Sequence, residues 1–172
     1  MVKLTNKEKM DNARKKFEEI AKQIRNKKEW SSSDLLKLKN FKPKKNFLDS
    51  EEKIKEITRK AFKLAKRDKT EDAIKELCNI NGVTISIASF ILTIKFPERY
   101  VPFDVITINE LRKKKCFKQN DIPKDTINSE DYPFFGYLSH YLEYIELMRK
   151  KAKEKGIKLE DLEREKWEKR IK

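Results

Sequence analysis

The chain is poor in the residues that interrupt helices: its 172 residues include three glycines and five prolines. Proteins built only of strands need many tight turns, and glycine and proline are prominent among the residues that form them. So low a content argues against an all-β fold. The sequence instead predicts an all-α fold, formed by one compact multi-helix domain.

Histidine and cysteine are scarce as well, and their scarcity excludes several kinds of site. The chain has one histidine, His140, and two cysteines, Cys78 and Cys116. One histidine cannot form a histidine-rich metal site, and two cysteines are too few for a disulfide framework or a cysteine-bound iron–sulfur cluster. We therefore expect no metal site and no resident cofactor.

The chain also lacks an apolar run long enough to cross a membrane. Its longest apolar stretch, Val83 to Phe96, contains serine, threonine and lysine and is shorter than the roughly 20 residues that a spanning helix needs. The opening residues, Met1 to Met10, contain no apolar segment typical of a secretory signal. We expect an intracellular protein, in the cytoplasm or nucleoid, with no membrane partner. The sequence leaves its oligomeric state open.

Positive charge is present in excess. Lysine and arginine number 43 against 29 acidic residues, which gives a formal net charge of +14, while 37% of the residues are hydrophobic, enough to form a core. Two segments without acids, Lys37–Lys45 and Arg112–Lys118, carry five basic residues each. This clustering favours a polyanionic partner, most simply DNA. The alternative is a lysine-rich composition, such as that of a thermophile, with solvated charged surfaces.

Apolar residues recur at helical spacing through most of the chain, which predicts a single helical domain over residues 1–172. Helices are expected to begin near residues 6, 32, 50, 70, 84, 104, 132 and 157, with C-terminal helices over about 132–170. Asp49 or Ser50 is the expected cap of one helix and Thr70 of another. The isoleucine-rich stretch from Thr84 to Lys95 is also compatible with a buried strand, but its length favours a helix.

Asn81, Gly82 and Val83 form an expected tight turn between two of these helices, within about residues 72–95. Glycine tolerates positive φ and lets another backbone come close. A turn that opens a helix presents unpaired N–H groups, which bind phosphate oxygens. The pattern is typical of a helix–hairpin–helix DNA-binding element, and an ordinary pair of helices joined by a glycine turn is the alternative.

Beyond the turn, an apolar helix leads to an acid at Asp104, which opens the expected helix 104–115. The series Leu77, Ile80, Gly82, Val83, Ala88 and Asp104 resembles the helix–hairpin–helix DNA glycosylase superfamily, which contains endonuclease III and the 8-oxoguanine glycosylases. The resemblance covers only the middle of the chain. It implies a DNA-glycosylase-like all-α fold, a double-stranded DNA partner, and a role in base excision repair. The activity implied is hydrolysis of the N-glycosidic bond of a damaged or mismatched base.

The resemblance also implies roles for single residues. Asp104 matches the catalytic carboxylate, which stabilises the oxocarbenium-like sugar or orients the attacking water; an ordinary helix cap is the alternative for this residue. Bifunctional members carry a lysine at the position of Ser86, and serine cannot form their Schiff base. We therefore expect a monofunctional enzyme. Thr84 replaces the second glycine of the family's hairpin. The resemblance also leaves open that a monovalent cation binds at the hairpin.

Contacts with DNA are expected from two groups of residues. Those expected to bind the phosphate backbone are Asn81, Gly82, Val83, Thr84 and Ser86 in the turn, together with Lys42, Lys44, Lys45, Arg112 and Lys113. Those expected to line a pocket for the extruded base are Trp30, Tyr100 and Phe103, although aromatic residues are more often part of a core. A helix–hairpin–helix protein that binds DNA without catalysis is the main alternative, and a helical interaction protein is a further one.

Overall fold

The computed structural model describes residues 6–38, 47, 49–103 and 134–169, and within these ranges the protein has seven helices and no strand. The all-α prediction is confirmed for this part of the chain. The helices are α1 (Asn6–Ile24), α2 (Ser32–Lys37), α3 (Glu51–Lys66), α4 (Thr70–Leu77), α5 (Ile85–Lys95), α7 (Phe134–Lys155) and α8 (Leu159–Lys169). The expected helix 104–115 lies outside the described residues. No described helix is long and apolar enough to cross a membrane.

The ends of three helices follow signals in the sequence. Ser31 caps α2 in a capping box: its side chain accepts from the Asp34 N–H, and the Asp34 carboxylate accepts from the Ser31 N–H. Ser50 caps α3 by accepting from the Lys53 N–H. Gly156 ends α7 at a φ of 65°, a conformation that glycine adopts without strain.

The expected cap at Thr70 is wrong. Thr70 is the first residue of α4, and Lys69 at the cap position makes no side-chain hydrogen bond to the helix. The chain reverses at Asp68, which has a φ of 58°, and this reversal turns the Thr70 side chain inward. Its hydroxyl lies 3.5 Å from the Tyr100 hydroxyl in the core, so it contributes to tertiary packing instead of capping.

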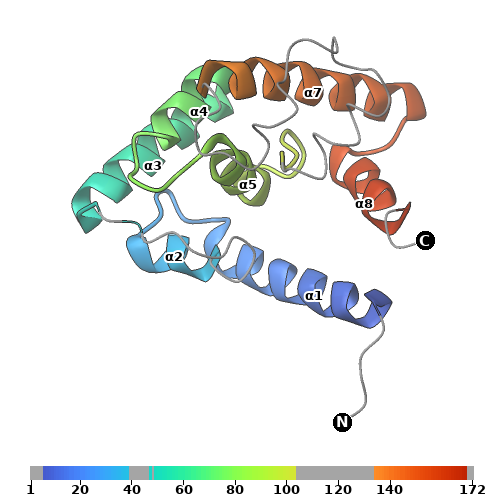
Figure 1. Cartoon of the computed structure of the whole chain (residues 1–172), viewed down its shortest axis with the longest axis horizontal. Coiled ribbons are helices and arrows are strands. Elements are labelled where there is room, and N and C mark those ends of the chain that lie inside the picture. The colour runs from blue at the N-terminus through green and yellow to red at the C-terminus, as the bar shows by residue number, and fades with distance from the viewer. Residues whose placement is uncertain (1–5, 39–46, 48, 104–133, 170–172) are drawn as a thin grey trace.

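Helix α5 lies in the middle of the molecule, with α7 on one side and α1 on the other (Figure 1). Nearly all of it is apolar, and the residues that it buries are Ile85, Ile87, Ala88, Ser89, Ile91, Leu92 and Ile94. A helix that is apolar around its whole circumference is stable only when other elements surround it. Helices α1, α3, α4 and α7 all contact α5. This stretch is therefore a helix in spite of its isoleucine content.

The segment between α1 and α2 is fixed to α3 by a buried threonine. The Trp30 N–H donates to Thr58 Oγ1 at 2.9 Å, and the same hydroxyl lies 3.2 Å from the Trp30 carbonyl oxygen. The Trp30 indole N–H donates to the Ile24 carbonyl at 2.9 Å, and its ring packs edge-on against Phe62. These bonds satisfy polar groups that would otherwise be buried without partners.

We predict that Thr58→Val lowers the free energy of unfolding by about 1–3 kcal/mol, because it leaves the buried Trp30 N–H without an acceptor. Thr93→Val is the matched control, since the Thr93 hydroxyl donates only to Ser89 in its own helix. Urea denaturation of both variants measures the difference. Equal losses in the two variants would contradict the importance of the Trp30 bond.

Candidate functional site

The connection between α4 and α5 is a short turn whose apolar residues face the core. Gly82 has a φ of 91°, a value that side-chain-bearing residues rarely adopt. The Val83 N–H donates to the Ile80 carbonyl at 2.9 Å and closes the turn. Ile80 and Val83 are 0% and 6% exposed, so their side chains anchor the turn to the core. The tips of the turn, Asn81 and Thr84, are exposed.

The start of α5 carries no side-chain cap. Thr84 occupies the cap position in an extended conformation but makes no capping hydrogen bond, and the first turn contains no acidic residue. The first N–H groups of a helix have no partner within it and carry the positive end of the helix dipole. The exposed edge of the turn at Thr84 therefore presents the positive end of the α5 dipole, which attracts an anion.

An acid from another part of the chain holds the turn from the side. Asp49 Oδ2 accepts from the Asn81 N–H at 2.5 Å, and Asp49 Oδ1 pairs with Lys53 Nζ at 2.5 Å. The hydrogen bond from Lys53, followed by that from Asn81, lowers the pKa of the Asp49 carboxyl. This arrangement fixes the turn against the beginning of α3 and brings the Lys53 ammonium close to it.

A buried hydroxyl joins the first turn of α5 to the segment that leads to Asp104. Ser89 Oγ donates to the Ser86 carbonyl at 3.0 Å and accepts from the Phe103 N–H at 3.0 Å. Ser89 is 0% exposed, so water does not compete for either bond. Phe103, which precedes Asp104 in the sequence, is therefore fixed beside α5, and Asp104 itself lies outside the described residues.

A cavity of about 210 Å³ lies beside this segment, between α1, α5 and α8. Its apolar walls are Phe17, Phe90, Pro97, Tyr100 and Pro102. The Phe17 and Phe90 rings lie 5.3 Å apart between centroids and close one wall. The cavity is smaller than the roughly 300–1,000 Å³ typical of drug-sized ligands, and it suits a small flat group such as one nucleobase.

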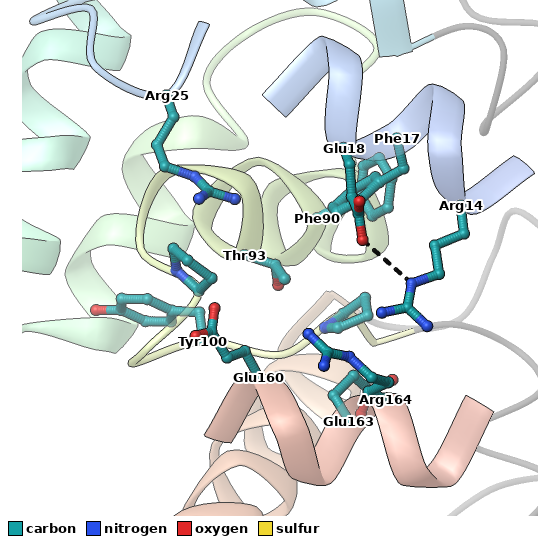
Figure 2. Close-up of a pocket in the computed structure, with 12 residues that line it drawn as sticks. Arg14, Phe17, Glu18, Arg25, Phe90, Thr93, Tyr100, Glu160, Glu163 and Arg164 are labelled. Atoms are coloured by element: carbon teal, nitrogen blue, oxygen red, sulfur yellow. Dashed lines mark hydrogen bonds and ion pairs between the residues drawn. The ribbon is translucent and has the colours of Figure 1, made fainter. Parts of the chain in front are cut away.

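Charged side chains surround the cavity from two opposite helices (Figure 2). Arg14 and Glu18 of α1 pair at 3.2 Å, and Glu160, Glu163 and Arg164 line the side formed by α8. Figure 2 shows Thr93 of α5 pointing into the space between these two helices. The cavity therefore combines aromatic walls with donors and acceptors at its edge.

The residues of the turn that were predicted to bind phosphate lie together just before α5 and in its first turn: Asn81, Gly82, Val83, Thr84 and Ser86. The other predicted contacts lie outside the described residues: Asp104, Lys42, Lys44, Lys45, Arg112 and Lys113. Their roles stay predictions. Burial raises the pKa of the Cys78 thiol, just after α4, to about 12, which disfavours the reactive thiolate form.

The three aromatic residues predicted for the base pocket have different surroundings. Trp30 and Phe103 are 0% and 1% exposed and lie in the core, where Phe103 packs against Tyr141 and Tyr144. In this conformation neither ring is available to stack on a base. Tyr100 borders the cavity but is also fully buried; its hydroxyl donates to the Ala65 carbonyl at 3.1 Å and its ring packs against Phe96, so it is no more available for stacking.

Sequence reasoning missed Phe17 and Phe90 as lining residues. They lie on helices that are far apart in the chain, and each belongs to an apolar helical pattern that predicts only core packing. One signal was present: Phe90 is four residues after Ser86, and therefore about one helical turn farther along the same face. The position of Phe17 follows only from the way α1 packs against α5.

Comparisons of the chain with protein-family models, with curated proteins and with solved structures each found no match. The function must therefore be inferred from the turn, from the Ser89 bridge and from the cavity. All three are built on α5: the turn opens it, Ser89 lies in its second turn, and Phe90 and Thr93 line the cavity.

We predict that the Asn81 amide resonance titrates with a midpoint below the usual aspartate pKa of 3.8, because the pKa of Asp49 is lowered in the folded state. A lowered pKa means that the Asp49 contact is complete above 3.8 and is lost as the pH falls through the lower value. Amide NMR at decreasing pH measures the midpoint. Asp49→Asn is the control and should abolish this titration. A midpoint at or above 3.8 would contradict the bond.

Proposed function

We propose that the protein is a helix–hairpin–helix DNA-binding enzyme that removes a damaged or mismatched base by hydrolysing its N-glycosidic bond. The observation that carries this proposal is the Ser89 hydroxyl, which connects the first turn of α5 at Ser86 to Phe103 beside Asp104. A glycosylase needs its DNA-binding turn and its carboxylate on the same sugar. The Ser89 bridge supports such an arrangement.

Duplex DNA is the proposed partner, and the turn between α4 and α5 is its proposed backbone contact. The support is the positive φ of Gly82, the exposed Thr84, which makes no capping bond, and the lack of an acidic residue in the first turn of α5. Such a helix start binds phosphate through its backbone N–H groups. The net charge of +14 favours the same partner.

Asp104 is the proposed catalytic carboxylate. It follows Val101 and Phe103, which are 0% and 1% exposed, so apolar groups lie next to it in the chain. A negative charge in a poorly hydrated site stabilises a developing positive charge on the sugar more strongly than it would in water. Because serine stands at position 86, water is the proposed nucleophile and no Schiff base is formed.

The cavity beside Pro102 is the proposed receptor for the extruded base. Its aromatic walls, Phe17 and Phe90, suit a flat ring. The charged groups at its edge offer both donors and acceptors to polar atoms of a base. Pro102 lines the cavity and lies two residues before Asp104, which links the base receptor to the proposed carboxylate.

A DNA-binding protein without catalysis is the second candidate, and it is favoured by the serine at position 86 and by Thr84 in place of the second hairpin glycine. The two candidates share the hairpin contact and differ in base release. Separate measurements of binding and of base release therefore distinguish them.

We predict that Thr84→Glu raises the dissociation constant for duplex DNA at least about tenfold, because facing a carboxylate with a phosphate costs several kcal/mol. An acid near a helix start stabilises the helix itself, so the loss will not come from unfolding. Thr84→Gln has the same shape without the charge and should remain within about threefold of the wild type, since the exposed residue caps nothing. Fluorescence anisotropy measures both. Equal affinities of the Glu and Gln variants for duplex DNA would show that the DNA does not contact the turn at Thr84.

We predict release of a base from at least one duplex in a panel that contains 8-oxoguanine, uracil, hypoxanthine, alkylated purines and mismatches. Asp104→Asn should slow that release by about 100-fold or more, the usual effect of losing one group that stabilises transition-state charge. Borohydride should trap no covalent adduct.

Thr93→Phe tests the cavity in the same assay, because it fills the space between α1 and α8 with a ring. It should abolish base release while the affinity for undamaged duplex stays as in the wild type. Release that survives in Asp104→Asn removes the proposed mechanism, and release that survives in Thr93→Phe moves the base to another pocket. Tight binding with no release from any duplex favours the second candidate.

A further inference from the structure

The charge of α3 changes sharply along its length. From Glu51 to Ile57 the chain has three acidic and two basic residues, whereas from Thr58 to Lys69 it has six basic residues and one acid. The six basic residues are all exposed. The second half of α3 and the turn after it therefore form a strongly positive surface, separate from the basic segments singled out in the sequence.

Most of these charges have no acidic partner among the residues that the structure describes. Within the described residues Lys60 pairs with Glu76, and the one acid of the segment, Asp68, is held by Arg99. No ion pair within the described part of the chain involves the remaining five, which we call the α3 basic stripe: Arg59, Lys63, Lys66, Arg67 and Lys69. Lysines near the start of α3 do have acidic partners, as in the pair Lys55–Glu51.

Stabilisation of the helix explains only part of the stripe. Basic residues in the last turn of a helix interact favourably with its dipole, and the effect falls off within that turn. This accounts for Lys63, Lys66 and Arg67. Arg59 lies in the middle of α3, where the dipole offers no such gain. The stripe also repels a neighbouring lysine. Burial, followed by the positive charge of Lys66, lowers the pKa of Lys95.

We propose that the α3 basic stripe is a second surface that binds the phosphate backbone of duplex DNA, apart from the α4–α5 turn. Arg59 and Arg67 are eight residues apart, which is about 12 Å along a helix. A duplex carries one charge per roughly 1.7 Å of its axis, so about seven phosphates fall within that length. The proposal rests on the DNA partner of the proposed function.

The stripe lies at a distance from the turn along α3. Asp49, just before α3, accepts a hydrogen bond from Asn81 of the turn. Arg59 is eight residues after Glu51, the first residue of α3, and therefore lies about 12 Å farther along the helix. A duplex bound by both surfaces therefore contacts the protein over more than one group of phosphates. The stripe contributes to affinity without regard to sequence, and this contribution weakens as salt is added.

The test is a salt titration of DNA binding with two triple variants of equal charge. Arg59→Gln/Lys63→Gln/Arg67→Gln neutralises the stripe, and Lys150→Gln/Lys151→Gln/Lys153→Gln neutralises three exposed lysines of α7. Each changes the formal net charge from +14 to +11, that is, 14 − 3. Binding to an undamaged duplex of about 20 base pairs, roughly two helical turns, is measured by anisotropy at several salt concentrations.

The stripe variant should bind at least about tenfold more weakly near 0.1 M salt, and the slope of log K against log salt should fall by about 2–3, close to 0.9 per lost phosphate contact. The α7 variant should keep the wild-type slope. Equal changes in both variants, or none in the stripe variant, overturn the proposal. Circular dichroism checks folding, and the double variant Arg59→Gln/Lys63→Gln replaces the triple one if the latter unfolds.

Failure of the stripe can be separated from failure of the proposed function. If the wild type binds duplex and Thr84→Glu weakens that binding while the stripe variant does not, only the stripe proposal fails. If the folded wild type does not bind duplex at low salt, the DNA partner itself fails, and the stripe proposal with it. If the wild type bound an acidic protein through the stripe but did not bind duplex, the stripe proposal would fail as well.

Discussion

One buried hydroxyl determines how the candidate site is assembled. Ser89 Oγ donates to the Ser86 carbonyl and accepts from the Phe103 N–H, and no part of Ser89 is exposed. A buried N–H that loses its acceptor costs about 1–3 kcal/mol, so the segment that ends at Phe103 is held firmly against α5. The turn between α4 and α5, the wall of the cavity and the residue before Asp104 all depend on this contact for their relative positions.

The described surface has parts where charges are paired and a part where most of them are not. Pairs such as Lys53–Asp49 and Arg14–Glu18 neutralise charge beside the turn and at the edge of the cavity. Exposed pairs of this kind contribute little to stability, and their main effect is to orient side chains. The α3 basic stripe has no such pairing within the described residues. A polyanion is the partner that such a surface fits.

The sequence was sufficient to predict features that depend on neighbouring residues. The helix start near residue 32, the cap expected at Asp49 or Ser50, which is Ser50, and the turn at Gly82 are local, and the structure agrees with each. The cavity was not predicted, because Phe17 and Phe90 meet only through tertiary packing. Thr70 was misplaced for a similar reason: the reversal at Asp68 turns its side chain toward Tyr100. The Ser89–Phe103 bond joins residues 14 positions apart, and no local pattern indicates it.

The central claim is that DNA binds at the first turn of α5, close to the segment that carries Asp104. The most direct measurement is the change in amide NMR shifts when the protein binds a duplex that contains a stable abasic-site analogue. The account predicts that the amides of Ile85, Ser86 and Phe103 are among those that shift most. Binding that leaves these three amides unchanged, while others shift, would contradict it.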